Sequence, residues 1–107
     1  MGTRLELSDI LNGIMTKLGK AYDGHVYFQP PESTKIQYPC IIYERNMGDS
    51  QFADNIPYIF KIRYQITVID HNPDSPILNE VAMIPGCTFD RHFVSDNLNH
   101  DTFNLYF

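Results

Sequence analysis

The chain lacks several features that mark well-known classes of protein. It contains no Trp and only two Cys, and its longest apolar runs are three or four residues. A membrane-spanning helix needs about 20 predominantly apolar residues in succession. The N-terminal residues also lack the basic segment and continuous apolar stretch of a secretory signal. We therefore expect a soluble, intracellular protein with no membrane partner.

The two cysteines do not form a recognisable motif. Cys40 and Cys87 are far apart in sequence, and neither belongs to a Cys-x-x-Cys pair or a dense cysteine framework. Each lies in an apolar run, which predicts two buried free thiols in a reducing compartment. A disulfide would need Cα atoms within about 7 Å, and the sequence alone leaves open whether the two are that close.

Basic residues are scarce. The chain has 8 Lys and Arg against 13 Asp and Glu, for a formal net charge of −5. Binding to the outside of a nucleic acid duplex requires clustered Lys and Arg, so the composition argues against a protein of that class. An acidic protein can still surround DNA without holding it.

What the chain does contain is typical of one folded domain over residues 1–107. Its 7 Tyr and 7 Phe favour β-structure. Residues 3–19 instead predict an amphipathic helix, and Thr3 and Glu6 match a capping box at its start. The apolar stripe of this helix recurs at three- and four-residue spacing, and it consists of Leu7, Ile10, Leu11, Ile14, Met15 and Leu18.

Five further segments have strand character. In the strongest, residues 58–70, apolar side chains from Ile62 to Val68 alternate with polar ones, which predicts a sheet with one face open to solvent. The other expected strands are residues 25–29, 40–45, 88–94 and 101–107. The last two are predicted to form a hairpin across the polar stretch 95–99.

A second helix is predicted between the third and fourth strands. Asp70 to Asp74 has turn chemistry, and Ser75 followed by Pro76 matches a helix N-cap and first position. The expected fold class is therefore α+β: a mostly antiparallel sheet with two helices packed on one face, in the order α-β-β-β-α-β-β.

No catalytic motif is present. The chain lacks a Gly-x-Ser-x-Gly nucleophile motif, a Cys with a plausible His base, and a Gly-rich phosphate loop. We expect a protein that is not an enzyme and uses no cofactor.

One polar cluster near the C-terminus invites a different interpretation. It comprises Asp90, His92, Asp96, His100 and Asp101. Strand alternation would place Asp90 and His92 on one face, and a hairpin would bring His100 near them. Such residues can bind a metal, although their spacing matches no standard site. We expect no metal and assign the cluster to turns and an edge strand, with a small metal-binding protein as an alternative.

The polar stretch 46–56 contains an aromatic residue, Phe52, and is interpreted either as a solvated hairpin tip or as an arm that inserts into a neighbouring subunit. Polar side chains of the long strand, such as Arg63, are either solvated or meet acidic residues across an interface. The subunit-interface candidates are Met47, Asp49, Phe52, Asp54, Lys61 and Arg63.

Several stretches in combination resemble a known group of small proteins. They are Tyr38-Pro39-Cys40-Ile41-Ile42-Tyr43, Ala53-Asp54-Asn55, Tyr64-Gln65-Ile66-Thr67-Val68-Ile69-Asp70, Asn72-Pro73-Asp74-Ser75, Phe89-Asp90-Arg91-His92-Phe93 and Asp96-Asn97-Leu98-Asn99-His100-Asp101-Thr102-Phe103. In their order, from residue 3 to the C-terminus, these stretches resemble the tail terminator, or tail-to-head joining, proteins of long-tailed phages and prophages of Gram-positive hosts.

The resemblance implies a virion structural protein that assembles in the host cytoplasm. Copies would form a hexameric ring that caps the tail tube and docks on the head connector while DNA passes through its lumen without specific binding. Other neck components, the head-closure and head–tail connector proteins, are the alternative. The resemblance assigns no individual residue a role.

Overall fold

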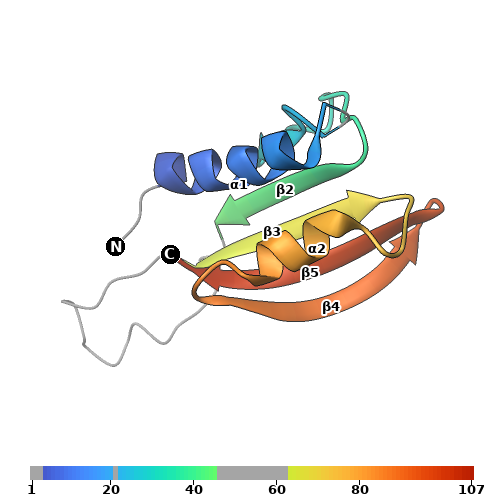
Figure 1. Ribbon diagram of the computed structural model, residues 1–107. Helices are drawn as coiled ribbons and strands as arrows, with labels where there is room; N and C mark the ends of the chain where they lie inside the picture. The colour runs from blue at the N-terminus through green and yellow to red at the C-terminus, as the bar shows by residue number, and fades with distance from the viewer. Residues whose placement is uncertain (1–3, 21, 46–62) are drawn as a thin grey trace.

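The computed structural model describes residues 4–20, 22–45 and 63–107. Two helices and a five-stranded sheet make up this part of the chain. In chain order they are α1 (Arg4–Leu18), β1 (Val26–Phe28), β2 (Cys40–Arg45), β3 (Arg63–Asp70), α2 (Pro76–Ala82), β4 (Cys87–Ser95) and β5 (Leu98–Tyr106) (Figure 1). The predicted α+β class and element order are confirmed.

Helix α1 forms where the apolar stripe predicts it. Leu7, Leu11 and Met15, spaced by four residues, are fully buried against the sheet. Gly19 follows the helix with a positive φ of 125° and ends it, as expected for a residue just beyond a C-terminus. The predicted cap at Thr3 lies outside the described residues.

Helix α2 begins at the predicted cap. The Ser75 side chain accepts a hydrogen bond from the amide of Ile77 at 3.3 Å, and Pro76 occupies the first turn. The preceding turn is built by side chains that accept backbone hydrogen bonds: Asp70 Oδ1 accepts one from the amide of Asn72, and Asn72 Oδ1 one from the amide of Asp74, both at 3.0 Å. The interpretation of this segment as a strand-to-helix turn is confirmed.

The strands lie in the order β1-β2-β3-β5-β4. Strand β1 pairs in parallel with β2, and every other neighbouring pair is antiparallel. The predicted hairpin is present and its turn is tight, because Asp96 and Asn97 both adopt positive φ, 53° and 63°. The predicted start of the long strand, residues 58–62, lies outside the described residues.

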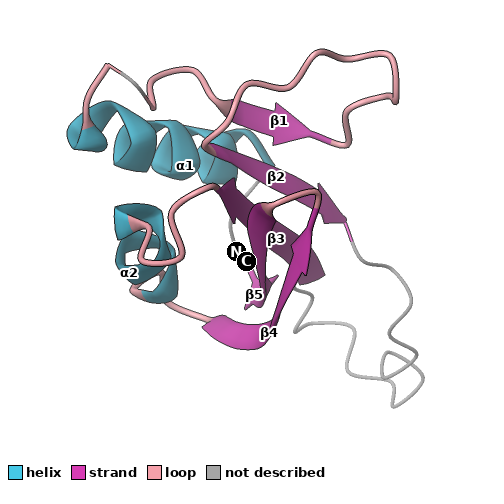
Figure 2. Cartoon of the chain, turned by 90° about the vertical axis from the view of Figure 1, so that its right-hand side faces the viewer, coloured by secondary structure: helices cyan, strands magenta, loops and turns pink. Residues whose placement is uncertain are grey.

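Both helices cover the same face of the sheet (Figure 2), called the helix face below; the opposite face is called the open face. Alternation along β3 buries Tyr64, Ile66 and Val68 on the helix face, while Gln65 and Thr67 are half-buried on the open face. The main core joins these residues to both helices and to Phe103 and Leu105 of β5. On the open face, a smaller cluster of Cys40, Ile69 and Leu98 lies against partly buried Tyr27, Ile36 and Ile42.

Candidate functional site

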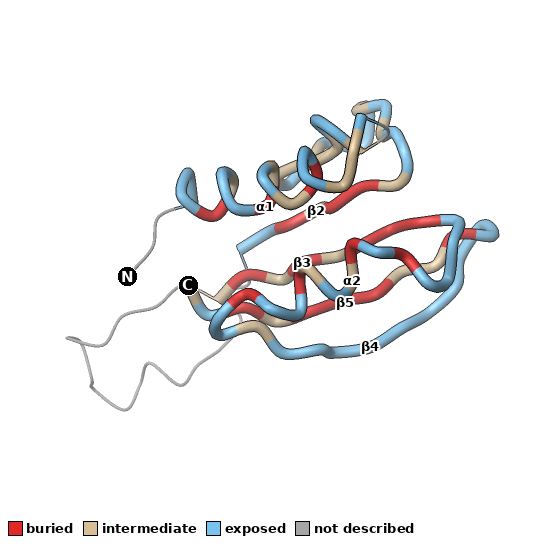
Figure 3. The backbone as a smooth tube through the Cα atoms, viewed as in Figure 1, coloured by how far each residue is buried: buried red, intermediate tan, exposed pale blue. Residues whose placement is uncertain are grey.

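The most exposed element of the sheet is its edge strand β4. Every residue of β4 after Cys87 is exposed, whereas the adjacent β5 is mostly buried (Figure 3). Three of the exposed side chains are large and apolar: Phe89 at 58%, Phe93 at 40% and Val94 at 61%. The sequence did carry a signal for an edge here, because three polar or charged residues in succession, Asp90 to His92, are typical of strands that end a sheet. The exposed apolar side chains beside them were not predicted.

A β-bulge interrupts β4 in its middle. Phe89 pairs with Phe103 and Arg91 pairs with the very next residue of β5, Thr102, so Asp90 is an extra residue without a pairing partner. The hydroxyl of Thr102 donates to Asp90 Oδ2 at 3.2 Å and accepts from the amide of Arg91 at 3.3 Å. The bulge therefore turns Asp90 toward Thr102, on the open face.

The predicted placement of the polar cluster is wrong for a physical reason. Strict alternation put Asp90 and His92 on one face, but the extra residue of the bulge shifts the alternation between them. His92 lies on the helix face, where its Nδ1 is 2.8 Å from Oδ1 of the buried Asp101. His100 lies on the open face, where its ring stacks on Phe93 with centroids 4.7 Å apart.

This geometry separates the residues of the alternative metal site. Asp90 and His100 lie on the open face and His92 on the helix face, so the three do not converge as that alternative requires. Across residues 4–20, 22–45 and 63–107, no group of three or more His, Cys, Asp or Glu side chains is placed to hold a metal ion. Asp96 is used in the hairpin turn.

The open face of β4 carries a stack of three side chains. The guanidinium of Arg91 lies over the ring of Phe93, 5.6 Å from its centroid, and Phe93 stacks in turn on His100. Cation–π contacts of this kind hold an Arg side chain in place without removing it from solvent. Arg91 is consequently presented at the edge of the sheet, beside Asp90.

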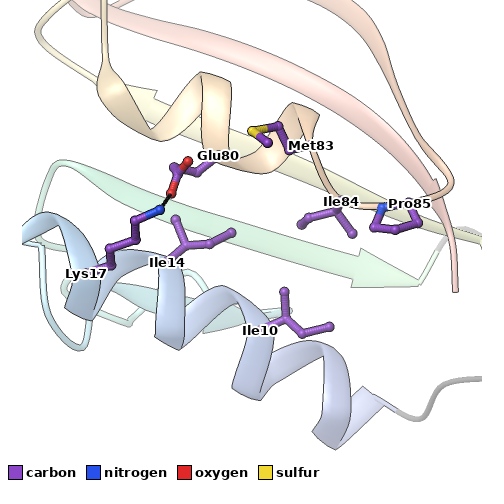
Figure 4. A pocket seen from close by; sticks show the side chains of 7 residues that line it. All are labelled: Ile10, Ile14, Lys17, Glu80, Met83, Ile84 and Pro85. Carbon is purple, nitrogen blue, oxygen red and sulfur yellow. Dashed lines mark hydrogen bonds and ion pairs between the residues drawn. The ribbon is translucent and has the colours of Figure 1, made fainter.

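A second candidate surface is an open groove between the two helices (Figure 4). Its volume is about 310 Å³, and its lining is mostly apolar. The lining residues are Ile10, Ile14, Lys17, Glu80, Met83, Ile84 and Pro85. Lys17 and Glu80 form an ion pair across one end, and Met83, 76% exposed, stands at the other side of the groove. Such a groove suits an apolar side chain from another protein rather than a charged ligand.

Most of the predicted interface candidates fall outside the described residues: Met47, Asp49, Phe52, Asp54 and Lys61. Arg63 is the exception. It begins β3, half-buried, and pairs across the sheet with Tyr106 of β5. Neither Ile10 nor Met83, which flank the groove, was predicted as a surface residue.

The two cysteines are free thiols, as predicted, but only Cys40 is buried, whereas Cys87 is half-buried. They lie on different strands, Cys40 on β2 and Cys87 on β4, with β3 and β5 between those strands. Burial, and then the charge of Asp70, raises the pKa of Cys40 to about 12. Burial alone raises the pKa of Cys87 to about 11. Both thiols are thus kept protonated, which is the opposite of what a nucleophile or metal ligand needs.

Comparisons with protein-family models, with curated proteins and with solved structures give no match to this chain. Neither helix of the described part of the chain is both long enough and apolar enough to cross a membrane.

Proposed function

We propose that this protein is a phage tail terminator, a virion structural subunit that forms a hexameric ring on the end of the tail tube and joins it to the head connector. The resemblance of its sequence to that family is the first ground for this proposal. The structural observation that supports it is the apolar groove between α1 and α2, lined by Ile10, Met83 and Pro85. The groove is small, so it fits one apolar side chain of another protein, and that is the contact this proposal gives it.

A ring needs two different patches on each subunit, because each copy contacts its neighbours head to tail. The groove is one such patch. Its partner in this proposal is the stretch 46–56 of the adjacent copy, whose single aromatic residue, Phe52, has the size and apolarity that the groove accepts. The net charge of −5 also suits a lumen through which DNA slides, because like charges suppress binding to phosphates.

Binding to tail tubes tests this function directly. Purified protein is mixed with tail tubes built from the tube protein of a long-tailed phage of a Gram-positive host, and the mixture is viewed by negative-stain electron microscopy. We expect a ring of several copies at tube ends, and a matching mass in solution at high protein concentration. A protein that remains monomeric at high concentration and never decorates tubes would overturn the proposal. Binding to head connectors without binding to tubes would favour a neck component instead.

The groove is tested by adding charge to it. Met83→Glu places a carboxylate in the groove and should abolish ring formation, while the melting temperature changes little because Met83 is exposed. Asn79→Glu is the matched control: it adds the same charge to an exposed position of α2 outside the groove. Phe52→Ala should weaken assembly as Met83→Glu does, with folding nearly intact. If Phe52→Ala instead unfolds the protein, Phe52 belongs to the core and the proposed anchor is wrong.

A further inference from the structure

The free edge of β4 is the largest unpaired edge in the described part of the sheet. Among the described residues the sheet ends at β4, and eight of the nine residues of this strand pair with β5 on their other side. An exposed strand of this length presents a row of backbone donors and acceptors that can pair with another strand. Its side chains decide which strand that is.

Because of the bulge, the sheet faces occupied by the side chains of β4 follow the same order in both directions from the midpoint between Asp90 and Arg91. Asp90 and Arg91 both lie on the open face beside Thr102. On either side of them come Phe89 and His92, both on the helix face, as their contacts with Phe103 and Asp101 show. The next pair outward is Thr88 and Phe93, both on the open face.

This symmetry means that β4 matches its own reverse. If two copies of β4 run antiparallel about the midpoint of Asp90 and Arg91, side chains on the same face always meet. Without the bulge the same register would set residues of opposite faces against one another, because alternation has a period of two. The extra residue in β4 therefore creates the match.

We propose that β4 is a dimerisation edge, on which a second copy of this chain pairs antiparallel so that Asp90 of each copy lies opposite Arg91 of the other. The occupant is identified by charge complementarity, since the acidic and basic residues meet twice across one two-fold axis. Phe89 of each copy lies opposite His92 of the other, and Thr88 opposite Phe93. The two sheets become one continuous sheet.

The same charges disfavour other pairings of the edge. Parallel pairing in register sets Asp90 opposite Asp90, and an antiparallel shift by one residue sets Arg91 opposite Arg91. Like charges directly opposite each other destabilise a strand pair. An interface that rejects alternatives in this way is specific as well as attractive. The contact closes at two copies, so it does not depend on the proposed ring, which needs head-to-tail contacts.

Charge reversal tests the pairing. Sedimentation velocity at concentrations too low for ring formation should show a dimer of the wild-type chain. Asp90→Arg and Arg91→Asp should each weaken dimerisation, by on the order of tenfold in the dissociation constant, because both cross-strand pairs become repulsive. The double variant, which exchanges the two charges, should restore the dimer.

Matched controls separate this contact from a general effect of charge. Glu32→Arg and Lys35→Asp make the same changes in charge on exposed residues of the loop that follows β1, at the other edge of the sheet, and should leave the dimer unchanged. Near-ultraviolet circular dichroism confirms that each variant is folded. Backbone amides of β4 should also exchange with deuterium more slowly at concentrations that favour the dimer.

Three results would overturn the inference: a wild-type chain that is monomeric at every soluble concentration, a dimer that tolerates both single reversals, or a double variant no better than the singles. The reversed variants also separate this inference from the proposed function. If tube binding occurs but no β4 dimer forms, the proposed ring is supported and the dimerisation edge is rejected. If the dimer forms but no tubes are capped, the dimerisation edge is supported and the proposed ring is rejected.

Discussion

The sheet ends in two very different strands. Strand β1 has three half-buried residues, and neighbouring segments contact side chains on both of its faces: Tyr27 accepts a hydrogen bond from the amide of Gln37, and the Arg4 guanidinium lies 4.9 Å from the centroid of the Phe28 ring. Strand β4 has nine residues and is exposed along almost its whole length.

The difference shows two ways of managing a sheet edge. A short strand leaves few backbone groups that another chain could pair with. A long open strand must instead rely on charges and a bulge to prevent unwanted pairing. Strand β4 carries both, in Asp90, Arg91 and the register shift between Phe89 and Arg91. The charges and the bulge disfavour pairing with most other strands. In β4 they are arranged so that an antiparallel second copy of β4 still fits.

The largest loss of stability that we expect tests the contrast between the exposed strand β4 and the core beside it. Phe89 and Phe103 touch edge to face with centroids 5.5 Å apart, yet Phe89 is 58% exposed and Phe103 only 3%. Phe103→Ala should lower the free energy of unfolding by about 3–5 kcal/mol, because it empties a packed site. Phe89→Ala should cost less than about 1 kcal/mol in the monomer. Urea unfolding at low protein concentration measures both, and equal losses would show that β4 is packed as tightly as β5.

A smaller effect compares the glycines that precede the two edge strands. Gly86, before β4, and Gly24, before β1, both have positive φ, 86° and 79°. A Cβ at Gly86 would lie 2.6 Å from the carbonyl oxygen of Tyr106, whereas one at Gly24 would meet nothing within 4 Å.

Gly24→Ala should therefore cost about 1 kcal/mol, from backbone strain alone. Gly86→Ala adds a clash with the backbone of β5 and should cost roughly 2–4 kcal/mol. Thermal unfolding of the two variants measures the difference. Similar losses would mean that β4 can move away from β5 at Gly86 without penalty.

The last prediction concerns the rate of thiol modification rather than stability, and it compares a cysteine of β4 with one of β2. Cys87, at the start of β4, is half-buried, whereas Cys40, in β2, is fully buried. At pH 8, iodoacetamide should modify Cys87 slowly and Cys40 only after unfolding, because burial raises both thiol pKa values. The rate at Cys87 should rise about tenfold per pH unit until the pH approaches its pKa of about 11, since only the thiolate reacts.

Mass spectrometry locates each modification, with Cys87→Ser leaving Cys40 as the only thiol. Rapid modification of Cys40 in the folded protein would contradict its burial beneath the loop that precedes β2. Raised thiol pKa values also carry a sign for stability: as pH rises above 9 the unfolded thiols ionise first, so the free energy of unfolding should fall.

Much of the fold was predictable because its signals are local. The stripe from Leu7 to Leu18 predicted α1, and Ser75 followed by Pro76 predicted the start of α2. Alternation predicted which residues of β3 face the helices. The candidate site was less predictable. Alternation predicted the wrong sheet face for residues after Asp90, because one inserted residue reverses the faces of all residues that follow it. No residue type at this position indicates a bulge.

Local patterns in the sequence are enough to predict the elements of this protein, their order and their class, since helix periods, strand alternation and caps depend on neighbours a few residues away. Local patterns do not indicate that β1 pairs in parallel with β2 or that β5 lies between β3 and β4. Those choices depend on contacts between residues far apart in the chain. They are also what leaves β4 at the open edge, where Asp90 and Arg91 become a surface instead of part of the interior.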